Sequence, residues 1–378
     1  MIYKVADNII SPLGLTTEEN LESTRAGRSM IKLHGEDLGV HEPFYGSLLD
    51  REKLDSISDK MIDNSDKYTF FEKLCILSAK SAIDSTGIDF SGEDVIFVLS
   101  TTKGNVGYLA HSLEDERCYI SSSAEKISAY FDNPNIPVVV SNACISGVCA
   151  QITAVRLLLT GRYNYAVVIG ADVLSEFIVS GFQSFKALGS GPCRPYDRER
   201  DGLNLGEGVA SMILAKSDEK RDDLWQYVAG SIHNDANHIS GPSRTGEGSY
   251  RVLMDLLKDM DPDDIAFINT HGTSTAYNDE MESIALHRAG LDFVPVNGLK
   301  GYYGHTLGAA GVLETVLSMK AADNGLILAT KGFEVNGTSY ELNISNENRG
   351  VNKQAFIKVL SGFGGSNAGI CYRKGDRG

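Results

Sequence analysis

The chain has 378 residues and a formal net charge of −15, with 42% hydrophobic and 22% charged residues. This composition is typical of a globular protein, and the negative charge argues against nucleic-acid binding. No apolar segment reaches the roughly 18–20 residues of a membrane-spanning helix, and Asp7 interrupts the stretch where a secretory signal would be continuous. We therefore expect a cytoplasmic protein with one large or two closely packed domains.

Segments with the composition of strands alternate with segments of helical periodicity through the first half of the chain. We predict strands at residues 2–10, 95–99, 138–140, 166–169 and 209–215, and helices from Thr16, at 70–86, at 123–130 and after residue 144. Residues 26–66 show little periodicity, so we expect an irregular excursion on the surface. Residues 177–201 hold several glycines, and we expect a long loop there, of the kind that often carries function.

The same alternation begins again near residue 224. We predict strands at 225–232, 265–269, 294–297, 356–360 and 369–372, and helices at 250–257, 279–287 and 307–322. The pattern favours an α/β protein made of two halves, residues 1–218 and 219–378. In both halves the polar motifs follow strands directly, which is where ligands bind in open α/β sheets.

Cys144 stands between the valine run 138–140, which we interpret as a strand buried on both faces, and a predicted helix. The apolar positions of that helix recur at helical spacing, at Ile145, Val148, Ile152, Val155 and Leu159. The positive end of a helix favours the thiolate form of cysteine, which is the nucleophile. Gly147 allows close packing behind the turn. The alternative is a small apolar cysteine that fills a gap.

Two histidines, His271 in NTHGTST and His305 in KGYYGHTLGAAG, stand in glycine-rich segments near predicted strands. A neutral imidazole can donate its N–H to a developing oxyanion, although each histidine could also be a hydrogen-bonded structural residue. Lys300 precedes His305 and is either solvated or a buried charge that needs a partner. Glu314 lies on an otherwise small or apolar helix, as a partner for Lys300 or a group that holds water.

Cys144, His271 and His305 could also form a zinc site, but no fourth ligand stands out, and the six cysteines form no CxxC pair. We therefore expect no metal and no cofactor. The segment GFGG around Phe363 could bring a backbone N–H to an oxyanion, because glycine permits close approach. Taken alone, Phe363 would be read as a core residue.

Five motifs occur in one order along the whole chain: SNACISG, RPYDRERDGLNLGEGVASMIL, NTHGTSTAYNDEME, KGYYGHTLGAAGVLE and SGFGGSNAG. In these motifs the sequence resembles the β-ketoacyl-[acyl carrier protein] synthases, condensing enzymes with the thiolase fold. The resemblance implies two similar βα halves in a five-layered α-β-α-β-α core. It also implies an acyltransferase that elongates fatty acid or polyene/polyketide chains by decarboxylative condensation.

The resemblance assigns roles to particular residues. Cys144 accepts the acyl group, and His271 and His305 bind the malonyl thioester carbonyl and promote decarboxylation. Lys300 organises the site electrostatically, with Glu314 nearby.

Further roles come from the same resemblance. Asp279 and Glu282 are structural acids of the histidine loop. The backbone N–H groups of Cys144 and Phe363 form the oxyanion hole, and Phe363 gates the acyl pocket.

The resemblance also implies partners, namely acyl- and malonyl-loaded acyl carrier protein and a second subunit, as a homodimer or a heterodimer with a related chain. Carrier proteins are acidic, so docking should use basic side chains, with candidates at Lys60, Lys67, Lys73, Arg198 and Arg200. The segment STTKGNV and the pair Tyr302-Tyr303 depart from the usual family pattern and leave the acyl substrate open.

Three other functions stay open. The first is a non-condensing subunit that sets chain length for a partner, although the intact Cys144 argues against it. The second is thiolytic cleavage, which needs a second catalytic cysteine in a matching motif. The third is a cysteine hydrolase, which depends on whether water reaches the site.

Overall fold

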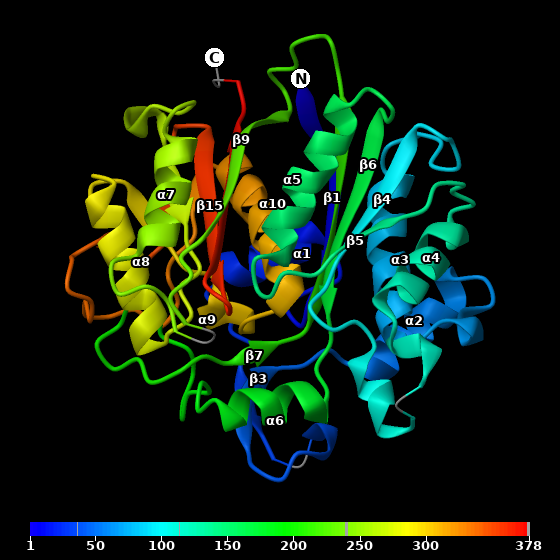
Figure 1. The fold of residues 1–378 in the computed structure, drawn as a ribbon, viewed down its shortest axis with the longest axis horizontal. Coiled ribbons are helices and arrows are strands. Elements are labelled where there is room, and N and C mark those ends of the chain that lie inside the picture. The colour runs from blue at the N-terminus through cyan, green and yellow to red at the C-terminus, as the bar shows by residue number, and fades with distance from the viewer. Residues whose placement is uncertain (36, 113, 239–240, 376–378) are drawn as a thin grey trace.

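A mixed β-sheet of eleven strands dominates the computed structural model, which describes residues 1–375 except 36, 113, 239 and 240 (Figure 1). Its strands are β1 (Ile2–Ile10), β4 (Val95–Ser100), β5 (Val138–Val140), β6 (Tyr165–Asp172), β8 (Gly208–Lys216), β9 (Trp225–Asn234), β10 (Phe267–Asn269), β11 (Pro295–Asn297), β13 (Asn343–Ile344), β15 (Ala355–Gly362) and β16 (Ser366–Arg373). The spatial order is β13-β11-β10-β15-β16-β9-β1-β8-β6-β4-β5. The two halves of the chain meet where β1 pairs with β9.

The strand order repeats between the halves. From the outside inward, the first half runs β5-β4-β6-β8-β1, and the second runs β11-β10-β15-β16-β9 with the two-residue strand β13 added outside β11. In both halves the outer three strands are parallel to one another, and the inner pairings are antiparallel. The structure therefore contains the duplication that the order of predicted elements suggests. The boundary between residues 218 and 219 stays a prediction.

The helices form layers around this sheet. They are α1 (Thr17–Arg25), α2 (Arg51–Met61), α3 (Phe70–Asp84), α4 (Ile120–Tyr130), α5 (Ser146–Leu159), α6 (Glu176–Ser184), α7 (Glu247–Leu256), α8 (Ala276–Arg288), α9 (Lys300–Tyr303) and α10 (Ala310–Asp323). Helices α5 and α10 pack on each other and contact strands of both halves, whereas α3 lies on the opposite face of the first half and α7 on that of the second. With α4 and α8 beside these outer helices, the layers alternate α-β-α-β-α (Figure 1).

The contact between α5 and α10 depends on two glycines. A Cβ atom at Gly147 would lie 2.7 Å from the Cα atom of Gly311, closer than real Cβ contacts allow. The predicted role of Gly147 in close packing is therefore confirmed. Because Cys144 precedes α5 and His305 precedes α10, this contact also sets how near the two side chains come.

Strand β5 is an edge strand, so the prediction of a strand buried on both faces is wrong. It pairs only with β4 among the described strands, and Val138, Val139 and Val140 are all half-buried. Three consecutive valines indicate a buried strand, but the rest of this chain covers only part of each valine side chain.

Two segments that we expected to be irregular contain regular structure. Residues 26–66 hold α2 and two short strands, β2 (Lys32–His34) and β3 (Phe44–Ser47), which join β7 (Leu205–Gly206) in a three-stranded sheet. The expected loop at 177–201 overlaps α6, which continues to Ser184. The pairing of β3 with β7, about 160 residues later, leaves no signal in the local sequence, which explains why the small sheet was missed. A further two-stranded sheet consists of β12 (Leu326–Ile327) and β14 (Arg349–Gly350).

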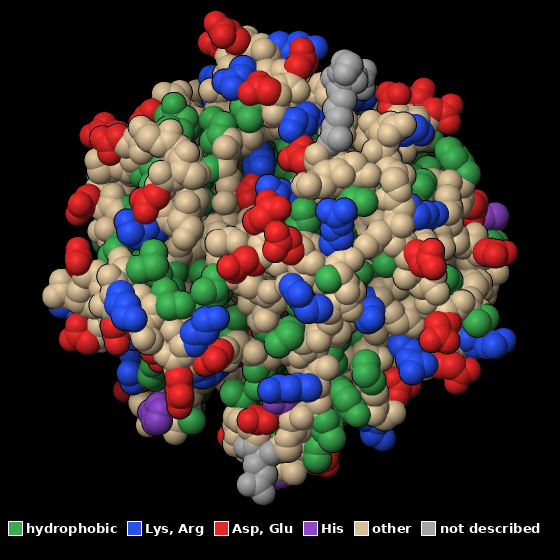
Figure 2. All heavy atoms as spheres, turned by 180° about the vertical axis from the view of Figure 1, so that it is seen from behind, with side chains coloured by type: hydrophobic (Ala, Val, Ile, Leu, Met, Phe, Trp, Pro, Cys, Tyr) green, Lys and Arg blue, Asp and Glu red, His purple; other side chains and the backbone are tan. Residues whose placement is uncertain are grey.

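Among the described residues, no helix combines the length and apolar character required to cross a membrane. Acidic and basic side chains are interspersed over the face of the molecule in Figure 2. The predicted strands and helices of both halves otherwise match the structure, with boundaries that shift by a few residues.

The glycine contact makes a stability prediction. We expect Gly311→Ala to lower the free energy of unfolding by about 1–3 kcal/mol, because the added methyl group overpacks the α5–α10 contact. Thermal unfolding followed by circular dichroism measures this change. The control is Gly181→Ala in α6, where no atom lies within 4 Å of the added Cβ. If both variants are equally stable, the close contact does not constrain the fold.

Candidate active site

Cys144 occupies the turn between β5 and α5. Ala143, directly before it, has a φ of 44°, a conformation that residues other than glycine rarely adopt. A strained turn between a strand and a helix is also how a nucleophile elbow presents its side chain. The expected strand–cysteine–helix junction is therefore confirmed.

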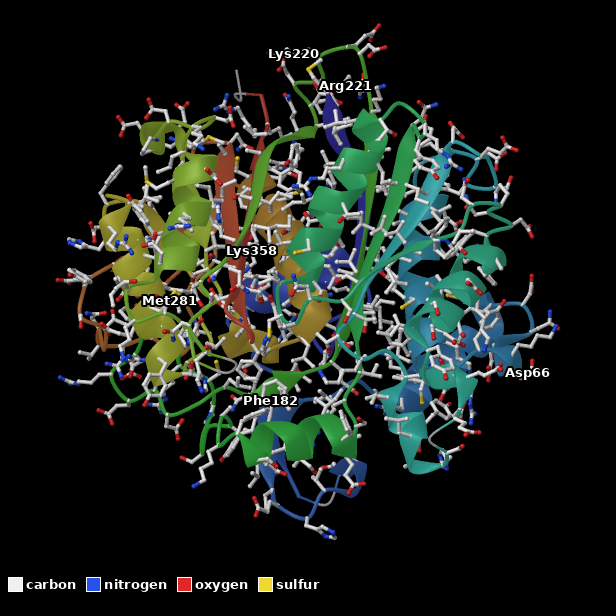
Figure 3. All side chains as sticks on the ribbon, in the orientation of Figure 1. Asp66, Phe182, Lys220, Arg221, Met281 and Lys358 are labelled. Carbon is white, nitrogen blue, oxygen red and sulfur yellow. The ribbon has the colours of Figure 1, made fainter. Side chains whose placement is uncertain are left out.

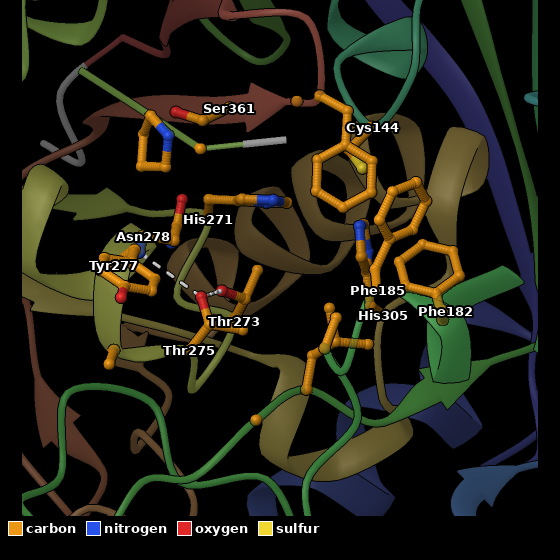
Figure 4. A pocket seen from close by; sticks show the side chains of 18 of the residues that line it. Cys144, Phe182, Phe185, His271, Thr273, Thr275, Tyr277, Asn278, His305 and Ser361 are labelled. Atoms are coloured by element: carbon orange, nitrogen blue, oxygen red, sulfur yellow. Dashed lines mark hydrogen bonds between the residues drawn. The ribbon is translucent and has the colours of Figure 1, made fainter. Parts of the chain in front are cut away.

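His271 follows β10 and His305 precedes α10, so both histidines come from the second half of the chain. The Sγ atom of Cys144 and one nitrogen of each imidazole all lie within 4.8 Å of one another. The ring centroids are 5.0 Å apart, and the rings are nearly perpendicular, at 82°. Figure 4 shows the two imidazoles extending toward the thiol from different sides. Three residues far apart in the sequence thus share one site.

The hydrogen bonding of His305 fixes its tautomer. The backbone N–H of Leu307 donates to Nδ1 of His305 at 3.3 Å, so Nδ1 carries a lone pair and the proton of the neutral ring is on Nε2. This Nε2 atom is buried and has no partner among the described residues. His305 is therefore a free N–H donor next to the thiol.

The same tautomer bears on a metal. Cys144, His271 and His305 are the group that could hold a metal ion among the described residues. A histidine that binds zinc usually donates its other ring N–H to an acceptor, whereas Nδ1 of His305 is an acceptor itself. The donor geometry fits an oxyanion better than zinc.

Behind the histidines, two buried lysines share one buried carboxylate. The Nζ atom of Lys300 donates to Glu314 Oε1 at 2.8 Å and to the carbonyl oxygen of His271 at 2.6 Å. The Nζ atom of Lys358 donates to Glu314 Oε2 at 2.5 Å and to the carbonyl oxygen of Thr270 at 3.0 Å. All three charged side chains are fully buried, and Figure 3 places Lys358 near the centre of the molecule. Both lysines therefore bind the backbone that carries His271.

Two carboxylates hold the histidine loop from its other side. Glu282 accepts hydrogen bonds from the backbone N–H groups of His271, at 2.7 Å, and Gly272, at 2.8 Å. Asp279 accepts from the backbone N–H groups of Thr273 and Tyr196, at 3.0 and 2.7 Å. Neither carboxylate lines a cavity at Cys144. These contacts fit structural acids.

Burial controls the protonation of the three central groups. It raises the pKa of Cys144 to about 11, although the positive charges of Lys300 and Lys103 oppose the shift. Burial, with the charge of Lys300, holds the pKa of His271 and of His305 well below the usual range. The resting site therefore holds a thiol and two neutral imidazoles. The helix end favours a thiolate, but desolvation outweighs it in the resting site.

The Lys–Glu–Lys network keeps its charges. Burial opposes ionisation of Glu314, but the charges of Lys300 and Lys358 outweigh it and lower the pKa of this carboxyl group. Burial lowers the pKa of Lys358 to about 8, opposed by Glu314. Two cations and one anion leave a net positive charge behind the imidazoles.

Cys144 lies where two cavities meet. The smaller, of about 360 Å³, contains Cys144, His271, His305 and Thr273 in its wall. The larger, of about 1010 Å³, extends from Cys144 along α6. Such a junction allows one molecule to approach the thiol while another group occupies the second cavity.

Phe363 lines both cavities, as Phe182 and Phe185 also do. It stacks on Phe182, with ring centroids 5.9 Å apart, and contacts Phe185 at 5.5 Å, yet it is 36% exposed. A Cβ atom at Gly362, directly before it, would lie 3.2 Å from the backbone nitrogen of Cys144. The end of β15 therefore lies against the cysteine turn, and Phe363 is no ordinary core residue.

Sequence reasoning missed Lys358. A signal was present, because AFIKVLSG places one lysine within a strand that is otherwise buried and largely apolar. The unusual pair Tyr302-Tyr303 is fully buried and lines neither cavity, whereas Thr102, Lys103 and Val106 of the segment STTKGNV line the larger one.

None of the five docking candidates lines either cavity. Lys73 pairs with Asp55, and the Arg200 side chain is 8% exposed and donates to the Gly337 carbonyl oxygen. Figure 3 shows Asp66, the neighbour of Lys67, at one edge of the molecule and away from Phe182 at the cavities. Docking through Lys60, Lys67 or Arg198 stays a prediction.

Comparisons with known proteins place the chain in a family. The family model of the β-ketoacyl synthase N-terminal domain matches residues 5–220, and that of the C-terminal domain matches residues 227–334. The 3-oxoacyl-[acyl-carrier-protein] synthase 2 of Vibrio cholerae is 24% identical, with 97% of each chain covered. The protein of the same name from Rhizobium meliloti is 33% identical over 64% of this chain and 61% of its own length.

A solved structure shows the same fold. The ketosynthase ApeO in complex with its chain length factor ApeC from Xenorhabdus doucetiae superimposes with a TM-score of 0.84, at 20% identity, over 99% of this chain and 98% of that chain. The thiolase-like fold expected from the sequence is therefore confirmed. The two matching domain models, which together span most of the chain, show that it belongs to the β-ketoacyl synthase family, a family of acyltransferases.

Proposed function

We propose that this protein catalyses decarboxylative condensation of an acyl group, held as a thioester on Cys144, with a malonyl group carried by acyl carrier protein. The observation that carries the proposal is the convergence of the Cys144 thiol and two neutral imidazoles within 4.8 Å, at the junction of two cavities. Relatives named 3-oxoacyl-[acyl-carrier-protein] synthase support the same reaction.

In the first half-reaction, the sulfur of Cys144 attacks the carbonyl carbon of an acyl thioester. The carrier thiol leaves with the proton that Cys144 loses, and the acyl group stays on Cys144. The backbone N–H groups of Cys144 and Phe363 stabilise the oxyanion of the tetrahedral intermediate. Because the resting group is a thiol, its proton must leave as the attack proceeds. The neutral imidazole of His271, within 4.8 Å, can accept it, whereas His305 Nε2 already carries a proton.

In the second half-reaction, the malonyl thioester enters and its bond to the carboxylate carbon breaks, releasing carbon dioxide. The electron pair remains as an enolate, whose oxygen accepts hydrogen bonds from His305 Nε2–H and from His271. The enolate carbon then attacks the acyl thioester, and Cys144 leaves as a thiolate that recovers a proton. One preorganised oxyanion donor contributes roughly a hundredfold to a thousandfold in rate.

The Lys300–Glu314–Lys358 network supplies the field for this step. Its net positive charge favours the enolate. Burial and this charge together keep both imidazoles neutral, so that each can donate a hydrogen bond. We assign Phe363 as the gate between the acyl cavity and the cavity through which the malonyl group arrives.

The acylation step makes the first functional prediction. We expect Cys144→Ala to abolish transfer of an acyl group from acyl carrier protein to the purified chain, measured by intact-protein mass. Cys149→Ala is the matched control, because Cys149 lies on α5, the helix that follows Cys144, and is also buried. Acylation that survives Cys144→Ala would contradict the role of Cys144 as the acyl acceptor. A wild-type chain that never takes an acyl group would favour the non-condensing subunit instead.

The raised pKa of Cys144 predicts a pH dependence. Below a pKa of about 11 the thiolate fraction rises roughly tenfold per pH unit, so alkylation of Cys144 by iodoacetamide should accelerate about a hundredfold between pH 7 and pH 9. The rate is measured by mass spectrometry, with the Cys144→Ser chain giving the background from other cysteines. A plateau already reached at neutral pH would contradict a resting thiol.

Lys358 should matter more for condensation than for acylation. We expect Lys358→Met to slow condensation by about tenfold or more, because it weakens the support of the backbone before His271 and the positive field at the enolate. Acylation of Cys144 should change far less. Lys358→Arg is the conservative comparison, and circular dichroism checks that both variants fold. Equal loss in both half-reactions would assign Lys358 to the fold alone.

We infer a second subunit at the edge of the sheet. The outer side of β5 is unpaired within the described chain, and Ile136 just before it is an apolar side chain with 83% exposure. Edge strands are sites where another chain can pair, and ApeO forms a complex with its chain length factor ApeC. We propose a dimer through β5, formed with a second copy or a related chain.

This dimer can be tested with one charge. We expect Ile136→Asp to weaken self-association at least tenfold in analytical ultracentrifugation, because it buries a carboxylate in the interface. Leu159→Asp is the control, since Leu159 is also apolar and exposed but lies at the far end of α5. A wild-type chain that is monomeric at all concentrations requires a different partner.

A further inference from the structure

Lys103 lies in the wall of the larger cavity, together with Cys144. It belongs to the segment STTKGNV, directly after the buried strand β4. The side chain is half-buried, and its ammonium group forms no ion pair or hydrogen bond with any residue that the structure describes. A basic group in this position faces whatever occupies the cavity.

The loop that carries Lys103 is held firmly. Asp172, which is fully buried, accepts hydrogen bonds from the Thr101 hydroxyl at 2.7 Å and the Thr102 backbone N–H at 3.0 Å. The Gly104 backbone N–H donates to the Thr101 hydroxyl at 3.0 Å. The residues on both sides of Lys103 are therefore fixed, and so is the direction from which its side chain approaches the cavity.

Other charges at the cavity do not neutralise Lys103. Arg51 already pairs with the buried Glu207 at 2.7 Å. Glu176 also lines the cavity, but it forms no ion pair with Lys103. The remaining wall is largely apolar, with Val106, Leu109, Leu174, Ile178, Phe182 and Leu307.

An unpaired ammonium is a poor neighbour for a saturated alkyl chain. Filling the cavity with such a chain removes water from the charged group and gives no hydrogen-bond acceptor in return. A chain that carries a carbonyl or carboxylate oxygen replaces the lost water with a charge-assisted hydrogen bond. The cavity therefore discriminates between acyl chains by an oxygen atom along their length.

We propose that Lys103 is a specificity-determining residue that selects acyl groups bearing a carbonyl or carboxylate oxygen over saturated acyl groups of the same length. The proposal rests on the function proposed above, in which Cys144 receives the acyl chain. Lys103 acts on the choice of acyl group, whereas Lys300 is already bound to Glu314 and His271. Its charge also opposes the raised pKa of Cys144, which agrees with a position close to the thiol.

The test compares acyl thioesters of pantetheine that differ in one feature: octanoyl, a keto-substituted octanoyl and an octanoyl group with a terminal carboxylate. In each case the Cys144 sulfur forms the new thioester, and pantetheine leaves as the thiol with the displaced proton. Rates of acylation are measured by intact mass for wild type, Lys103→Met and Lys103→Arg. Lys353→Met, which removes an exposed lysine that lines neither cavity, is the matched control.

We expect wild type to prefer at least one oxygen-bearing chain over octanoyl by about tenfold to a hundredfold, the contribution of one charge-assisted hydrogen bond. The two oxygen-bearing probes show whether a ketone or a carboxylate is the better partner. Lys103→Met should reverse the preference toward octanoyl, Lys103→Arg should keep it in part, and Lys353→Met should leave it unchanged.

Three results would overturn the proposal. Equal acylation rates for all three acyl groups in wild type would show that the cavity does not select among them. An unchanged ratio of the oxygen-bearing to the octanoyl rate in Lys103→Met would show that Lys103 is not the selecting residue. Loss of the dimer in Lys103→Met, measured by ultracentrifugation, would place Lys103 in the subunit interface. The rate of iodoacetamide alkylation in Lys103→Met serves as a control, because a general effect of Lys103 on the thiolate would slow every probe equally and leave the selection unchanged. Absence of acylation by any probe, including in wild type, would instead refute the proposed function itself.

Discussion

The buried carboxylate of Glu314, shared between Lys300 and Lys358, is the interaction on which the site depends. Charges without water are costly unless they are paired and hydrogen-bonded, and here each ammonium group also binds a backbone carbonyl next to His271. The network therefore has two effects. It fixes the position of one histidine, and it leaves a net positive charge that favours an anion in front of the imidazoles. With burial, which is the larger cause, this charge also keeps both imidazoles neutral.

The duplicated fold explains how this network meets a thiol from the other half of the chain. In each half, the third strand of the large sheet in chain order leads toward one of the two helices of the middle layer. Strand β5 leads through Cys144 to α5, and strand β11 leads through His305 to α10. The contact between Gly147 and Gly311 brings those helices together. Neither half alone contains the site, because the thiol belongs to the first and the imidazoles and their charge network belong to the second.

Much of this arrangement could be predicted from the sequence, because each central residue stands in a motif that follows or precedes a regular element. Cys144, His271 and His305 were identified in this way, and so was the pairing of Lys300 with Glu314. Lys358 was missed, since no motif surrounds it and its signal is a single charge within a buried strand. The raised pKa of the Cys144 thiol could not be predicted either, because desolvation depends on three-dimensional burial and the sequence shows only the helix end. The small sheet within residues 26–66 depends on pairing with residues 205–206, which no local pattern reveals.

A single-turnover measurement tests the central claim most directly, that one thiol and two imidazoles in a shared pocket carry out carbon–carbon bond formation. The chain is first acylated on Cys144 and freed of excess thioester, and malonyl carrier protein is then added. The account predicts that loss of the acyl group from Cys144, release of carbon dioxide and appearance of β-ketoacyl carrier protein occur in equal amounts. Release of the acyl group as a free acid, or an acyl group that stays on Cys144, would contradict it.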